Sequence, residues 1–135
     1  MDEMREIACN TIDQQSEELK ALSMSIWNMP ELGFNEFHAH SVLTEYLLTA
    51  GFHVEKSFKL ETAFRAMYKP ENSTNGPNIA VLCEYDALPG IGHACGHNLI
   101  AEVGIATAVG VKAAMIANMD TKTFGNVSLS FSLNI

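Results

Sequence analysis

The chain has 135 residues, enough for one domain with a modest hydrophobic core. Its 16 acidic residues against 8 lysines and arginines give a formal net charge of -8 at pH 7. An acidic chain without a basic stripe is a poor candidate for binding nucleic acid or an anionic membrane surface. We therefore expect neither nucleic acid nor a membrane as a partner.

The start of the chain is charged, and no apolar segment of the signal-peptide kind follows it. Three cysteines in a chain of this type, Cys9, Cys83 and Cys95, are typical of reduced thiols, so we expect a cytoplasmic protein. The long apolar segment 99–118 contains Glu102 and Lys112, whose charges are costly inside a bilayer. This segment is therefore expected to be a buried helix.

Helical and strand patterns alternate along the chain, which predicts an α/β fold with a central, mostly parallel sheet flanked by helices. Asn35 and Asn98 are the expected N-caps of two of the helices. The strand pattern before Asn98 is apolar on both faces, as in a central strand covered by helices. The expected helices are about 3–28, 35–51 and 98–119, and the expected strands are 52–55, 62–68 and 78–83.

The segment 83–98 is the most informative stretch of the sequence, because two acids, two histidines and a thiol lie together between a predicted strand and a predicted helix. Ligands of open α/β sheets bind at this end of the strands. Imidazole and thiolate groups favour zinc-like divalent ions. Cys95 and His97 are separated only by Gly96, so that both side chains can converge on one ion, and Asp86 could orient a histidine ring.

Other interpretations of this segment stay open. His93 could equally be a hydrogen-bonded structural residue, and Cys83 is expected to be a buried thiol without chemistry. A structural zinc site needs four ligands, commonly as two close pairs, whereas the sequence offers one such pair. Catalytic sites use fewer protein ligands and keep a position for water. The residues therefore predict half of a catalytic metal site.

Two segments carry a resemblance to a known family. The first is Glu84–Pro89 followed by Gly92–His97, which resembles the metal loop of the amidohydrolase branch of the aminoacylase/carboxypeptidase metallopeptidase family. The second, Trp27–Glu36, is similar to the N-terminal signature of that branch. Details of both loops, together with residues 60–66, point to a subgroup of dipeptidases whose substrates end in a basic residue. The similarity extends from about residue 12 to about residue 118.

The resemblance implies a metal-dependent hydrolysis of amide bonds in dipeptides that end in Arg or Lys. By position, Cys95 and His97 match the first two metal ligands, and Asp86 matches an aspartate that orients a metal-bound histidine. Glu84 stands where relatives have a histidine, which leaves its role open. The cofactor is expected to be a divalent metal ion, zinc first, with manganese or cobalt as alternatives. Members of the family form homodimers through an inserted domain.

The family pattern continues beyond this sequence, into a Gly-Thr-Pro-Xaa-Glu-Glu loop that carries the general base and then into the dimerisation domain. We therefore expect residues 1–135 to form the N-terminal portion of the catalytic domain, with 124–135 as an atypical tail. The isolated chain is expected to be inactive. Two alternatives stay open: a non-catalytic chain that associates with a partner, and a metal- or redox-responsive module built on Cys95.

Overall fold

The computed structural model describes residues 2–70, 78–118 and 126–131, the last of these by its backbone only. Its helices and strands follow the alternation expected from the sequence. The helices are α1 (Asp2–Gln14), α2 (Ser16–Asn28), α3 (Phe37–Thr49) and α4 (His97–Ala117). The strands are β1 (His53–Lys56), β2 (Phe64–Tyr68), β3 (Asn78–Cys83) and β4 (Asn126–Phe131).

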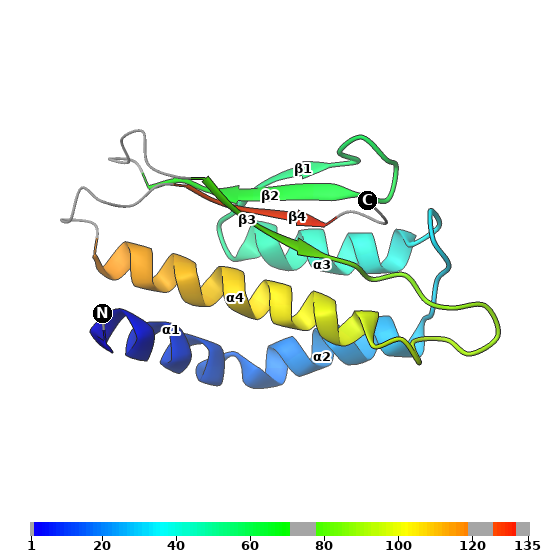
Figure 1. Ribbon diagram of the computed structural model, residues 1–135, viewed down its shortest axis with the longest axis horizontal. Helices are drawn as coiled ribbons and strands as arrows, with labels where there is room; N and C mark the ends of the chain where they lie inside the picture. Colours follow the sequence, from blue (N-terminus) through cyan, green and yellow to red (C-terminus); the bar gives the residue numbers. More distant parts are fainter. Residues whose placement is uncertain (1, 71–77, 119–125, 132–135) are drawn as a thin grey trace.

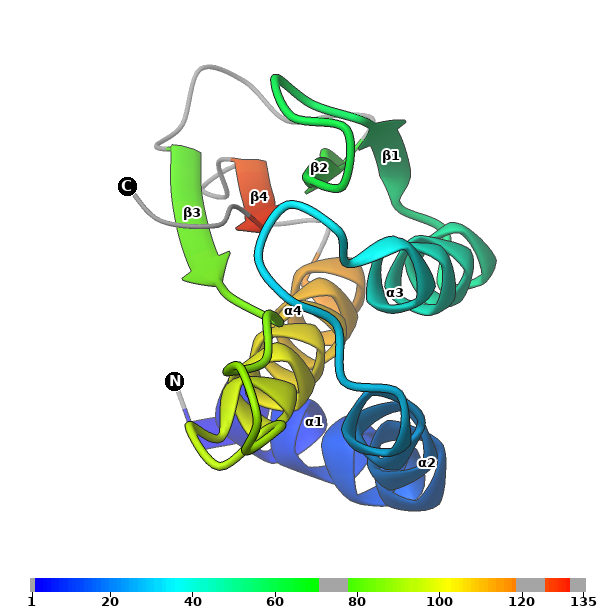
Figure 2. The same cartoon turned by 90° about the vertical axis from the view of Figure 1, so that its right-hand side faces the viewer.

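These elements form three layers (Figures 1 and 2). The sheet is one outer layer, α3 and α4 lie beneath it, and α1 and α2 cover α4 from the other side. The long helix expected over 3–28 is divided at Gln15, so that α1 and α2 follow one another with a short interruption. The α/β prediction is confirmed, with the helices gathered on one face of the sheet.

The sheet has the strand order β1-β2-β4-β3, and its strand directions differ from the mostly parallel arrangement that was expected. Among the described strands, β3 and β4 form a parallel pair, whereas β2 is antiparallel to both β1 and β4. The connections explain these directions. A short link between β1 and β2 permits antiparallel pairing, while the crossover through α4 makes β3 and β4 parallel.

Among the described strands β3 lies at an edge of the sheet, so the central position predicted for residues 78–83 is wrong for this sheet. The backbone of β4 occupies the place between β2 and β3. As a result, Ile79 and Leu82 are 60% and 59% exposed. An apolar pattern reports the strand but not its place in the order, since that place is decided by where β4 returns to the sheet.

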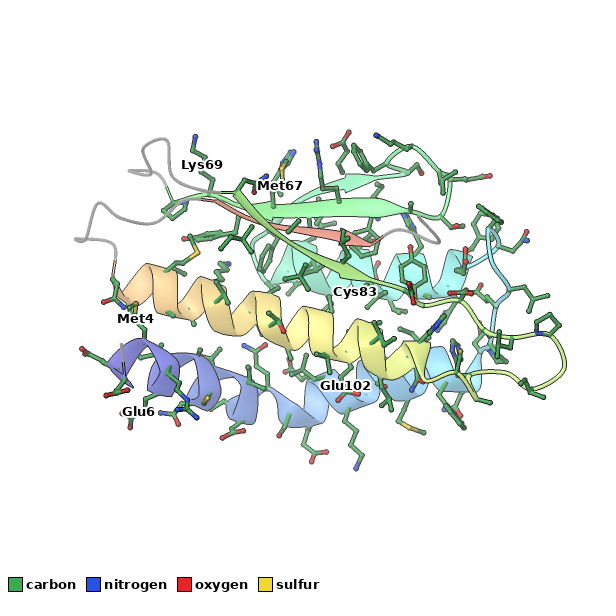
Figure 3. All side chains as sticks on the ribbon, viewed as in Figure 1. Met4, Glu6, Met67, Lys69, Cys83 and Glu102 are labelled. Atoms are coloured by element: carbon green, nitrogen blue, oxygen red, sulfur yellow. The ribbon has the colours of Figure 1, made fainter. Side chains whose placement is uncertain are left out.

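The hydrophobic core lies between the sheet and the middle helical layer. Leu43 and Leu47 of α3, Ile105 of α4 and Phe64 of β2 are fully buried there. Met67 and Lys69 extend away from the helices on the other face of the sheet, whereas Cys83 lies on the side of α4 (Figure 3). The helical face of the sheet is thus the buried face, as the half-apolar pattern of β2 requires.

Helix α4 runs through the middle of the molecule and explains the apolar segment of the sequence. By length and composition alone it could cross a bilayer, but it packs between α1, α2 and the sheet. Small residues let α1 approach closely: a Cβ atom at Gly110 would lie 3.0 Å from Cδ1 of Ile12 and 3.2 Å from the carbonyl oxygen of Ala8. The small residues of this helix therefore serve contacts with α1 in addition to the sheet.

Candidate metal centre

The chain between β3 and α4 places its side chains alternately on two sides. Tyr85 turns into the core and is 1% exposed. Its neighbours Glu84 and Asp86 instead reach the imidazole of His97. Because successive residues of an extended backbone point to opposite sides, the acid at 84 and the acid at 86 can act on one group while residue 85 anchors the backbone.

His97 is the first residue of α4, and its ring lies between the two carboxylates. Nδ1 of His97 is 2.7 Å from Oδ1 of Asp86, and Nε2 is 3.3 Å from Oε2 of Glu84. The side chains of His97 and Asp86 are 21% and 15% exposed, while that of Glu84 is 43% exposed. The shorter and better buried contact holds Nδ1, which leaves Nε2 as the nitrogen facing the more open side.

Cys95 lies close to the same acid, with Sγ 3.7 Å from the carbonyl oxygen of Asp86. The next residue, Gly96, has φ of 80°, a left-handed conformation in which a side chain would be strained. This residue forms the N-cap of α4, so the expected cap at Asn98 is wrong. Asn98 lies inside the first turn, buried, and its Nδ2 donates to Oγ of Ser23 at 3.0 Å.

Two other candidate residues are buried away from solvent. His93 is 3% exposed, and burial lowers the pKa of its imidazole, with the nearby His97 adding to this effect. Cys83 is 4% exposed, and burial raises the pKa of its thiol to about 11. The buried position of Cys83 agrees with the inert thiol expected there. Among the described residues, neither ring nitrogen of His93 has a hydrogen-bond partner, so the hydrogen-bonded structural role considered for this residue is not observed.

The donor set fits a zinc-like ion in its chemistry. A thiol, an imidazole held by a carboxylate and a second carboxylate are the groups that such ions accept. Within the part of the chain that the structure describes, no three His, Cys, Asp or Glu side chains form a complete group for holding a metal. The half-site that the sequence predicts therefore stays a prediction, with Cys95, His97, Asp86 and Glu84 as the residues that could contribute to it.

Sequence reasoning left two acids of the loop before α3 without a role. The carboxylate of Glu31 accepts from the backbone N–H groups of His38 and Ala39 in the first turn of α3, at 2.8 and 3.0 Å. The N-cap position of α3 is Glu36, so the expected cap at Asn35 is wrong. Its carbonyl oxygen accepts from the N–H of Ala87 at 2.7 Å. Glu36 is fully buried beside Thr62. Their place in the Trp27–Glu36 signature was the available signal.

The chain is similar in sequence to known hydrolases over most of its length. Xaa-Arg dipeptidase of Mus musculus is 50% identical over 115 residues, covering 80% of this chain and 27% of the relative. The Homo sapiens protein of the same name is 51% identical over 114 residues, covering 77% and 26%. One component of the p-aminobenzoyl-glutamate hydrolase of Escherichia coli is 31% identical over 130 residues, covering 83% and 26%.

Solved structures agree with these relatives. The Bacillus subtilis YXEP protein, described as a dinuclear metal binding peptidase from the M20 family, matches with a TM-score of 0.58 and 26% identity over 83% of this chain and 35% of its own. Over the matched residues, the chain belongs to the amidohydrolase/M20 peptidase family.

A putative aminohydrolase from methicillin-resistant Staphylococcus aureus shares the fold, with a TM-score of 0.72 and 18% identity over 94% of this chain and 34% of its own. No family model matches the sequence. The chain spans about a quarter of the length of the family's curated relatives that it matches. The partial coverage fits an incomplete domain of the M20 type.

Proposed function

We propose that this chain carries one part of the metal centre of a dipeptidase that acts on substrates ending in Arg or Lys. The observation that carries the proposal is the position of His97, whose ring is held between Asp86 and Glu84 at the start of α4. The substrate class is proposed from the two relatives named Xaa-Arg dipeptidase, at 50% and 51% identity.

The residues have separate roles in this proposal. Cys95 and His97 would hold the divalent ion, His97 through Nε2, since Nδ1 is engaged by Asp86. Asp86 fixes the ring orientation and keeps the proton on Nδ1, which makes Nε2 the better metal ligand. Glu84 lies beside Nε2 and adds negative charge there. When bound, a zinc-like ion polarises a carbonyl group and lowers the pKa of a bound water.

Hydrolysis requires a general base in addition to a metal ion. In the family pattern this base belongs to a Gly-Thr-Pro-Xaa-Glu-Glu loop, and residues 1–135 contain no such sequence. We therefore propose that the chain binds the metal ion but does not turn over dipeptides by itself. Binding and turnover are thus two separate parts of the proposal.

The test compares the full chain with a Cys95→Ser/His97→Ala double variant. Zn²⁺ affinity is measured by competition with a chromophoric chelator, and Co²⁺ is added to read the thiolate-to-metal absorption band. We expect stoichiometric binding and a thiolate band in the original chain and neither in the double variant. Equal binding by both proteins would overturn the assignment of the ligands.

The same samples are then assayed for hydrolysis of β-alanyl-lysine and Xaa-Arg dipeptides with and without added metal. We expect no metal-dependent hydrolysis. Metal-dependent turnover that is lost in the double variant would instead show that residues 1–135 contain their own general base. The two measurements therefore test the metal ligands and the catalytic competence of the chain independently.

A further inference from the structure

Tyr85 connects the candidate metal centre to a buried hydrogen-bond chain that the proposed function does not use. Its ring stacks on Phe64, with centroids 6.1 Å apart and an angle of 18° between the rings. Its hydroxyl donates to the carbonyl oxygen of Thr62. Because Tyr85 stands between Glu84 and Asp86, any rotation of its backbone would move both acids relative to His97.

The chain of hydrogen bonds continues from Thr62 to Glu36. The Thr62 hydroxyl donates to Oε2 of Glu36 at 2.6 Å, and Oε1 of Glu36 accepts from the N–H of Phe34 at 3.0 Å. Glu36 is fully buried and Thr62 is 1% exposed. A buried carboxyl is costly unless it is hydrogen-bonded, so this acid is held in one place by its partners.

Burial also raises the pKa of Glu36, which favours its neutral form in the folded chain. The hydrogen bonds give the Glu36–Thr62–Tyr85 network a fixed direction: Tyr85 donates to the Thr62 carbonyl oxygen, and the Thr62 hydroxyl donates to Glu36. The network joins the loop before α3, the segment before β2 and the segment after β3.

A second contact supports the far side of the same segment. The N–H of Ala87 donates to the carbonyl oxygen of Glu31 at 2.7 Å, and Leu32 and Ala87 form a parallel bridge. The segment from Glu84 to Ala87 is therefore fixed at two points, the Tyr85 side chain and the Ala87 backbone. Asp86 lies between these two points.

We propose that Glu36 is a positioning residue of the metal centre, acting through Thr62 and Tyr85 to set the backbone from which Glu84 and Asp86 reach His97. The inference rests on the proposed function of that centre but concerns its geometry. It assigns a role to the acid that ends the Trp27–Glu36 signature. It also explains why a polar network is kept in the core beside Phe64.

The test reads the His97 ring directly in the metal-free full chain. Long-range ¹H–¹⁵N NMR spectra at mildly alkaline pH report which imidazole nitrogen carries the proton, and a His97→Ala variant assigns the signal. In the original chain we expect the proton on Nδ1, donated to Asp86. Thr62→Val, Tyr85→Phe and Glu36→Ala should each lose this tautomer as the main form, whereas Glu36→Gln should retain it.

Thr44→Val is the matched control. Thr44 is also fully buried, and among the described residues its hydroxyl bonds only to carbonyl oxygens of its own helix, those of His40 and Ser41. All variants are compared below their melting temperatures, as judged by circular dichroism. We expect Thr44→Val to lower the melting temperature without changing the His97 tautomer. An unchanged tautomer in folded Thr62→Val and Glu36→Ala, or a changed one in Thr44→Val, would overturn the proposal.

This readout separates the two proposals. If the network variants change the His97 tautomer but the original chain does not bind Zn²⁺, the positioning role of Glu36 is supported and the proposed metal function is overturned. If the chain binds Zn²⁺ but the network variants leave the tautomer unchanged, the metal function is supported and the positioning role is overturned.

Discussion

Nδ1 of His97 lies 2.7 Å from Oδ1 of Asp86, although the two residues are 11 positions apart and belong to different parts of the fold. Asp86 follows β3, and His97 begins α4. The contact fixes the orientation of the ring. Its strength can therefore be tested through metal affinity.

Replacing Asp86 by Ala should weaken Zn²⁺ binding by roughly 10- to 100-fold, because the ring then loses the partner that fixes its orientation and tautomer. The measurement is a Zn²⁺ competition titration. Glu102→Ala is the control, since it also removes one acidic side chain from the protein, but at a position of α4 outside the site. Equal losses in both variants would mean that net charge, and not ring orientation, controls the affinity.

The three cysteines should differ in their reaction with iodoacetamide at neutral pH. Cys9 is exposed and should react first, Cys95 is partly buried and should follow, and Cys83 should be protected by its burial and its thiol pKa of about 11. Mass spectrometry after timed quenching gives the three rates. Added Zn²⁺ should slow the alkylation of Cys95 alone. Alkylation of Cys83 as fast as that of Cys9 would contradict the buried position of Cys83 at the end of β3.

The stability of the chain should fall as pH rises relative to that of Glu36→Gln. Burial raises the pKa of Glu36 above its ordinary value of 4.5, and the carboxylate of Asp86 adds to this effect. Below pH 4.5 the group is protonated in both the folded and unfolded states, so its full contribution is present. As pH rises towards the folded-state pKa, the unfolded state ionises first and that contribution is lost.

Urea unfolding of both proteins at a series of pH values, from about pH 4 to about pH 8, measures their free energies of unfolding and so tests the predicted direction of the change. The difference between the original chain and Glu36→Gln cancels the shared effects of the other acids. A difference that stays constant over this range would show that Glu36 has the same pKa in both states.

Leu43→Ala should destabilise the fold by about 2–5 kcal/mol, because Leu43 is fully buried between α3 and the sheet and its removal leaves a cavity. Urea unfolding followed by circular dichroism measures this loss. Leu48→Ala on the same helix is the control, since Leu48 is 48% exposed. A similar loss for both would mean that helix propensity, and not packing, decides the outcome.

Leu82→Lys should reduce self-association of the chain. The exposed edge strand β3 and the start of α4 line an apolar cavity of about 270 Å³, and such an edge favours pairing with further strands. Its lining residues are Val81, Leu82, Cys83, Leu99, Ile100, Val103 and Gly104. Sedimentation velocity at increasing concentration compares this variant with Met24→Lys, which replaces a residue of α2 that is 44% exposed. If both variants self-associate to the same extent, the association involves a surface other than the β3 edge.

The positions of most helices and strands, and the chemistry of the loop before α4, can be predicted from local sequence patterns. Period and composition indicate β3 and the helix that follows it, α4. The thiol of Cys95, the imidazole of His97 and the acid of Asp86 stand at a local spacing that predicts shared chemistry without a structure. Local patterns succeed here because backbone periodicity and ligand chemistry are properties of neighbouring residues.

The strand order, the exposed edge of β3 and the partners of Glu36 depend instead on long-range packing. The β4 backbone enters the sheet between β2 and β3, and no local pattern in residues 78–83 reports that choice. Glu84 likewise gains its place beside His97 only when α4 folds back against the end of β3. Contacts between residues distant in sequence depend on how the whole core packs, and the Glu36–Thr62–Tyr85 network exists only once that packing has brought three separate segments together.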